Sequence, residues 1–159
     1  MITGIRDHLA GPLMLALFCL GHSGISMAGD ILPLRVVYDV AVDTPEAVDN
    51  VLARASHLSN MTGADPLEGS IVLVLRGSEV AFFAKDGDAT YKQLVERARS
   101  LSVGGIIKIR MSELALKVRG MSADDVQDFI EIVPFGDAEI ARLQIEESHA
   151  YLQAHNLAP

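Results

Sequence analysis

Apolar runs and amphipathic stretches alternate along the chain from residue 34 onward. Residues 34–40 form a short Val-rich run and residues 71–75 are continuously apolar, which is typical of strands buried in a parallel sheet. Between them, Thr44-Pro45-Glu46 supplies an N-cap, a first-turn proline and an early acid, and apolar residues then recur at helical spacing. The pattern predicts a strand, a helix that ends at Gly63, and a second strand.

The second half of the chain repeats this alternation. Asp88 predicts the start of a helix that ends at Gly104-Gly105, and residues 106–109 and 129–133 are predicted strands. From residue 136 to about residue 154, two apolar seams predict one final helix with two packing partners. Three short segments are less defined: residues 80–84 fit a strand or one helical turn, residues 111–118 a short helix or a loop, and residues 122–125 a capped turn.

Strand and helix units of this length require crossover helices, so the sheet should be mostly parallel and covered on both faces. We therefore expect a three-layer, Rossmann-like α/β domain with about five strands. No internal repeat or second domain boundary interrupts residues 29–159, which we interpret as a single domain.

Residues 1–28 have the pattern of a secretory signal peptide. The uncharged run 13–20 follows Arg6 and is too short to cross a bilayer as a helix, and Ser26-Met27-Ala28 places small residues before a cleavage site at Gly29. We expect cleavage there, a periplasmic or secreted mature protein, and no integral membrane span after cleavage. A buried N-terminal helix is the alternative interpretation.

Charge and cysteine content narrow the class of protein. The net charge is −8, aromatic residues make up 5% of the chain and Trp is absent, so no nucleic-acid partner is expected. Cys19 is the only cysteine, and Phe18 before it is too large for a lipidation signal. Cleavage after Ala28 would leave no thiol for a disulfide, a metal site or a nucleophile.

Two phrases in the second half carry a family resemblance. Residues 116–122 (LKVRGMS) and 132–144 (IVPFGDAEIARLQ) resemble the end of the DsrE/DsrF-like (YchN-like) sulfur-relay family. Residues 51–63, leading into 71–77, resemble it as well. The resemblance covers about residues 35–153 and implies a Rossmann-like α/β domain that usually assembles as a homotrimer or larger oligomer.

The resemblance also draws attention to Ser112. Members that pass sulfur carry a cysteine a few residues upstream of the Lys-x-Arg-Gly phrase, and Ser112 occupies that position here. A hydroxyl cannot form a persulfide, and a neutral serine is a poor nucleophile without a base. No Gly-x-Ser-x-Gly motif surrounds it, so hydrolase chemistry is not expected. No confident catalytic residue remains, and the chain should bind without reacting or act as a scaffold.

A ligand pocket is expected where the parallel strands end, because ligands of such sheets bind outside the carboxyl ends. Arginines after the strands would supply positive charge, and the N-terminus of the last helix would supply free amides for a small anion. The same charges would also fit a solvated basic face or ion pairs between subunits. The candidate ligand-binding residues are Arg76, Gly77, Arg110, Ser112, Arg119 and Gly136.

No cofactor or metal site is predicted from the remaining motifs. His57 falls on the polar side of its helix, and His149 and His155 are poorly in phase for shared coordination. Gly104-Gly105 precedes a strand, the wrong order for a dinucleotide-binding loop.

The leading hypothesis is an exported, oligomeric DsrE-like accessory or binding protein that recognises a small sulfur-containing anion. One alternative is a sulfur-relay component that works with a partner's thiol or a retained Cys19. Another is a purely structural oligomer whose last helix packs against neighbouring subunits through Tyr151 and Leu152.

Overall fold

A computed structural model describes residues 34–62 and 70–156 of the 159-residue chain. The predicted signal peptide, with Cys19, lies outside the described residues, as does Gly63. The fold is built on a five-stranded sheet in which every pair of neighbouring strands is parallel, in the order β4-β3-β2-β1-β5. The strands are β1 (Arg35–Val40), β2 (Ser70–Leu75), β3 (Lys108–Ser112), β4 (Glu131–Val133) and β5 (Ala150–Gln153).

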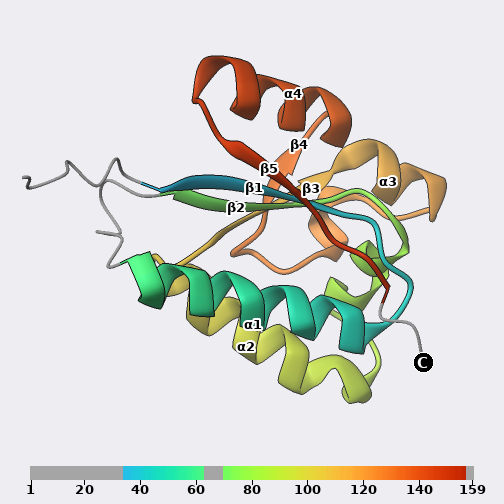
Figure 1. Ribbon diagram of the computed structural model, residues 1–159. Coiled ribbons are helices and arrows are strands. Elements are labelled where there is room, and N and C mark those ends of the chain that lie inside the picture. The colour runs from blue at the N-terminus through green and yellow to red at the C-terminus, as the bar shows by residue number, and fades with distance from the viewer. Residues whose placement is uncertain (1–33, 63–69, 157–159) are drawn as a thin grey trace, which may run out of the picture. The chain divides into compact units, whose positions relative to one another are not determined.

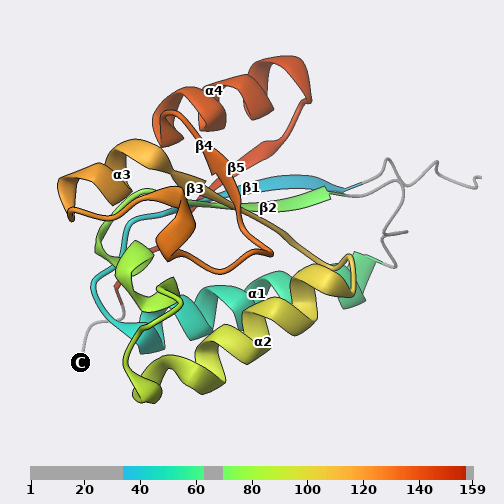
Figure 2. The same cartoon turned by 180° about the vertical axis from the view of Figure 1, so that it is seen from behind.

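Helices cover both faces of this sheet. Helices α1 (Pro45–Thr62) and α2 (Lys92–Val103) lie on one face and α4 (Gly136–Glu146) lies on the other, as Figures 1 and 2 show. The short helix α3 (Glu113–Val118) follows β3 directly. Three 3-10 turns complete the described chain: η1 (Ser78–Phe83), η2 (Ala89–Tyr91) and η3 (Ala123–Asp125). The predicted three-layer, mostly parallel α/β fold is confirmed.

Successive side chains of a strand point to opposite faces of the sheet, so each face has its own core cluster. The two clusters differ in size. Tyr38, Leu73 and Met111 belong to the large core cluster that includes residues of α1 and α2. The cluster on the α4 face is small and consists of Val37, Val72, Val74, Ile140 and Leu143. Near the carboxyl ends of the strands the α4 face becomes polar, and this end carries the candidate site.

The C-terminal part of the chain differs from its prediction. Helix α4 ends at Glu146, and Ala150–Gln153 form the edge strand β5, which pairs with β1. Ser148 has a φ of 56°, in the left-handed region, so the helix is broken without a glycine or a proline. The predicted single helix to about residue 154 is therefore wrong, and Tyr151 and Leu152 belong to a strand.

Smaller differences concern element boundaries. Residues 80–83 lie within η1, and Ala84 after them is extended and forms an isolated antiparallel bridge with Val126. The third strand begins at Lys108 because the amides of Ile106 and Ile107 still donate to the Leu101 carbonyl of α2. Asp88 acts as the predicted cap and accepts a hydrogen bond from the Thr90 amide at 2.8 Å. Of the described helices, none is both long and apolar enough to cross a membrane.

Candidate functional site

A pocket of about 220 Å³ opens at the carboxyl end of the sheet, on the α4 side. Its walls come from the residues after β2, from the end of β3, from α3 and from the start of α4. Four of the six sequence-predicted residues line it, and Gly136 packs directly behind them. The lining residues are Arg76, Gly77, Ser112, Leu114, Ala115, Val118, Arg119, Phe135 and Asp137.

Ser112 is the last residue of β3 and is 2% exposed. Its Oγ accepts a hydrogen bond from the Gly136 amide at 3.2 Å, which joins β3 to the first turn of α4. No acceptor for the hydroxyl hydrogen is found among the described residues. The hydroxyl therefore keeps a donor for a molecule in the pocket.

Gly136 makes this contact possible because it has no side chain. A Cβ at this position would lie 2.9 Å from the Arg76 Cβ and 3.3 Å from the Ser112 Cβ. The start of α4 therefore approaches β2 and β3 as closely as only glycine permits. The first turn of α4 therefore packs against β2 and β3 beside the pocket. Its Gly136 amide already donates to Ser112 and is not free for a ligand.

Arg76 is held by carboxylates. Its Nε and Nη2 donate to the two oxygens of Asp39 at 2.5 and 2.8 Å, and Asp137 lies 3.4 Å from Nε. The Tyr151 hydroxyl donates to Asp39 at 2.7 Å. Burial opposes the ionisation of Asp39, but the hydrogen bonds from Arg76 and Tyr151 outweigh it and lower the pKa of this carboxyl. The positive charge of Arg76 is therefore largely neutralised within the protein.

Arg119 is the least compensated cation of the pocket. It follows α3, is exposed, and makes one long hydrogen bond from Nε to the Gly77 carbonyl at 3.4 Å. Within residues 34–62 and 70–156, no carboxylate lies within ion-pair distance of its guanidinium. Gly120, in the left-handed region at φ 69°, ends the helix just behind it. Arg119 can thus offer its two terminal nitrogens to an anion.

Arg110 is not part of this pocket, although the sequence groups it with the other arginines. Its Nε donates to Glu131 at 2.8 Å and its Nη1 donates to Glu139 of α4, which also binds Arg142. Both hydrogen bonds and charge lower the pKa of Glu139, with Arg142 the largest cause and burial opposing it. Lys117 likewise pairs with Glu113 at 2.8 Å. Arg110 and Lys117 therefore form their ion pairs within one chain.

Glu79 was not predicted and helps to shape the pocket. It is fully buried in η1, and its carboxylate accepts hydrogen bonds from the amides of Gly77 at 2.8 Å and Val42 at 3.2 Å. Burial raises the pKa of Glu79, and the amide hydrogen bonds only partly offset this. The side chain ties the chain after β1 to the chain after β2. The sequence signal was an acid beside the apolar segment 80–84.

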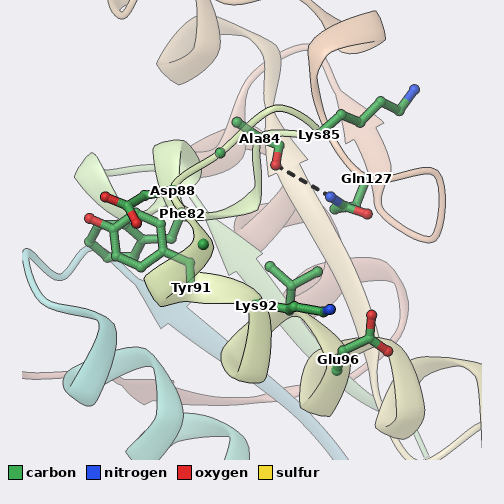
Figure 3. A pocket seen from close by; sticks show the side chains of 11 residues that line it. Phe82, Ala84, Lys85, Asp88, Tyr91, Lys92, Glu96 and Gln127 are labelled. Carbon is green, nitrogen blue, oxygen red and sulfur yellow. Dashed lines mark hydrogen bonds between the residues drawn. The ribbon is translucent and has the colours of Figure 1, made fainter.

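A second pocket of about 220 Å³ lies beside the start of α2 (Figure 3). Some of its polar groups are engaged within the protein. Gln127 donates to the Ala84 carbonyl at 3.3 Å and accepts from Arg99, while Lys85 pairs with Asp128. In Figure 3 the Lys85 side chain extends away from Tyr91. Tyr91, Lys92 and Glu96 also line this pocket, and their side chains have no hydrogen bond or ion pair within the described residues. The pocket around Ser112 differs from it by lying at the carboxyl ends of β2 and β3, where ligands of parallel sheets bind.

The histidines in residues 34–62 and 70–156 do not assemble a metal site. His57 is exposed, as predicted, and His149 is buried before β5, where its Nδ1 lies 3.2 Å from the Leu143 carbonyl. In the part of the chain that the structure describes, no group of three or more metal-ligating side chains comes together.

The chain matches no protein-family model and no curated protein. Two solved structures share its fold. A protein of unknown function, MTH1491 from Methanobacterium thermoautotrophicum, superposes with a TM-score of 0.62 at 22% identity, over 76% of this chain and 98% of that chain. The ychN protein from E. coli superposes with a TM-score of 0.52 at 17% identity, over 76% of this chain and 98% of that chain. At these identities the likeness establishes the fold, and it confirms the YchN-like architecture that the sequence resemblance implies.

Proposed function

We propose that this chain is an exported, DsrE-like accessory protein that binds a small, sulfur-containing anion without transforming it. The observation that carries the proposal is the pairing of two unused donors in one pocket at the carboxyl end of β3. Ser112 and Arg119 both line this pocket, the first with a hydroxyl hydrogen and the second with terminal guanidinium nitrogens to donate. Ligands of parallel α/β sheets are expected at this edge.

Binding without transfer is supported by the surroundings of Ser112. Its oxygen cannot carry a sulfane atom, and its hydrogen-bond partner is the Gly136 amide, which is a donor and not a base. No histidine or carboxylate in the described residues is bonded to the Ser112 hydroxyl to activate it. The side chain therefore serves as a hydrogen-bond donor to the ligand.

Isothermal titration with sulfate, sulfite, thiosulfate, tetrathionate and the monoanion methanesulfonate tests this function. At least one of these anions should bind the full mature chain, and Arg119→Gln should weaken its binding about tenfold. Lys117→Gln is the matched control, since it removes one charge from α3 but the charge is paired with Glu113. Equal affinity in the wild type and Arg119→Gln, or no binding of any inorganic anion or sulfonate, would reject the proposal.

Self-association is the second part of the proposal. Ile145 on α4 is 81% exposed, and Tyr151 on the neighbouring edge strand is also exposed, which leaves apolar surface for a second copy of the chain. Native mass spectrometry should detect a trimer or larger assembly, and Ile145→Asp should dissociate it. Val103→Asp, on the far helix layer and 77% exposed, is the control that should leave the assembly intact.

Export rests on the pattern of residues 1–28. The mass of the protein recovered outside the cytoplasm should correspond to a chain that begins at Gly29. A secreted chain that keeps Cys19 would instead support the sulfur-relay alternative, because a thiol would then be present.

A further inference from the structure

The pocket around Ser112 has an apolar wall as well as its two polar donors. Leu114, Ala115 and Val118 of α3 line one side, and Phe135 at the start of α4 lines another. Leu114, Val118 and Phe135 are large apolar side chains that remain exposed, and Val118 is 78% exposed. Exposed apolar side chains around a hollow favour an occupant that covers them with apolar atoms of its own.

The charges that face the pocket favour a single negative charge on this occupant. Arg76 is bound by both oxygens of Asp39, and Asp137, which also lines the pocket, adds a further negative charge beside it. Arg119 is left as one cation without an ion-pair partner in the described residues. Asp43 is exposed and accepts hydrogen bonds from Ser78 and Asn156, which are the main causes of its lowered pKa, and the charge of Arg119 adds to this lowering without forming an ion pair. A doubly charged oxyanion would meet Asp137 with too little positive charge to balance it.

The volume of the pocket limits the size of this ligand. About 220 Å³ is below the usual range for drug-sized molecules, so the ligand has a head group and a tail of roughly four to six carbon atoms.

We infer that the pocket takes an organic monoanion, with a sulfonate-type head group on Ser112 and Arg119 and a short apolar tail against Leu114, Val118 and Phe135. This rests on the proposed function and names its ligand class. The polar donors and the apolar side chains line the same pocket, so one molecule can satisfy both. Inorganic sulfate or thiosulfate would satisfy only the donors.

Calorimetric titration of the full mature chain with methane-, butane- and hexanesulfonate measures the contribution of the tail. Affinity should rise about threefold for each added methylene, since burial of one methylene is worth roughly a factor of four when complete. Hexanesulfonate should also bind more tightly than thiosulfate. Neutral 1-hexanol should bind at least tenfold more weakly than hexanesulfonate because it lacks the charge for Arg119.

Two matched variants localise the effect. Val118→Ser shortens the apolar wall at the last residue of α3, and Val103→Ser makes the same change at the last residue of α2, where the side chain is 77% exposed. In Val118→Ser, the gain in affinity for each added methylene should be at least twofold smaller than in the wild type. In Val103→Ser, this gain should equal that of the wild type. Both positions are exposed, so neither variant should unfold the protein.

The outcomes separate the inference from the function on which it rests. Thiosulfate binding that equals or exceeds that of hexanesulfonate, with Arg119→Gln weakening it, would overturn the organic monoanion and keep the anion-binding function. Failure of every sulfonate and every inorganic anion to bind would overturn both. A dependence on tail length that survives in Val118→Ser would place the tail elsewhere and overturn the inference.

Discussion

The hydroxyl of Tyr151 donates a hydrogen bond to Asp39 at 2.7 Å across 112 residues of sequence. Asp39 in turn holds Arg76 through both of its oxygens. The edge strand β5 is thereby connected to the wall of the candidate pocket through three side chains. Removal of the Tyr151 hydroxyl oxygen alone therefore measures how much this connection contributes to the free energy of unfolding.

Tyr151→Phe should lower the free energy of unfolding by about 1 kcal/mol, because it removes one hydrogen bond to a charged acceptor. Urea denaturation of the full mature chain measures this loss. Tyr91→Phe is the control, since Tyr91 stacks on Phe82 and its hydroxyl has no hydrogen bond within the described residues. Equal losses in the two variants would contradict a stabilising role for the Asp39 contact.

Gly136→Ala should lower the free energy of unfolding by about 1–3 kcal/mol, because the new methyl would press on Arg76 and Ser112. Thermal unfolding followed by circular dichroism checks the change. Ala138→Gly alters the same turn of α4 by one methyl on an exposed position, and should cost at most about 1 kcal/mol through helix propensity. A Gly136→Ala variant as stable as the wild type would show that α4 can shift away from β2.

Arg110→Gln should separate stability from binding. The variant should lose about 2 kcal/mol of unfolding free energy, since it leaves the largely buried carboxylate of Glu139 with fewer partners. Its affinity for anions should stay that of the wild type. Arg119→Gln should show the reverse, with weaker binding and unchanged stability, because its side chain is exposed. Loss of anion binding in Arg110→Gln would return this residue to the site.

His149 should make the protein sensitive to mild acid. The side chain is 4% exposed, its Nε2 has no partner within the described residues, and burial lowers its pKa from 6.5. A lowered pKa means that the unfolded chain binds the proton more readily, so stability is complete above about pH 6.5 and falls as the pH drops through the folded-state pKa.

Urea denaturation at pH 7.5 and at pH 5 measures this dependence. His149→Gln should reduce the difference in unfolding free energy between the two pH values, whereas His57→Gln should not, because His57 is exposed. Burial raises the pKa of Glu79, which acts in the opposite direction, so the comparison of variants is the readout and the absolute slope is not. An unchanged difference in His149→Gln would contradict the prediction.

Much of the fold followed from local patterns. Continuous apolar runs predicted β1 and β2, and the caps at Thr44 and Asp88 predicted the two helices of one layer. Strand β5 could not be predicted, because its pairing with β1 is a long-range contact and its residues continue the helical spacing of α4. A left-handed Ser148 gives no signal comparable to glycine or proline.

The location of the candidate site could be predicted from the sequence, but the ion-pair partners of its charged residues could not. The rule that places ligands at the carboxyl ends of parallel strands found Arg76, Ser112 and Gly136. Spacing along β3 could not show that Arg110 lies under α4 beside Glu139, since the partner is 29 residues away in sequence. Nor could it show that Glu79 turns inward to bind two amides.

In the sheet, β1 to β4 lie side by side in the order in which they follow one another along the chain. β5 departs from this order, because it comes last in the chain but pairs with β1, the first strand. The four consecutive strands β1 to β4 can therefore pair before β5 is in place. During that interval the outer edge of β1 has free backbone groups that can pair with other polypeptides. Pairing of β5 with β1 covers this edge, so truncation before Ala150 should leave a protein prone to aggregation.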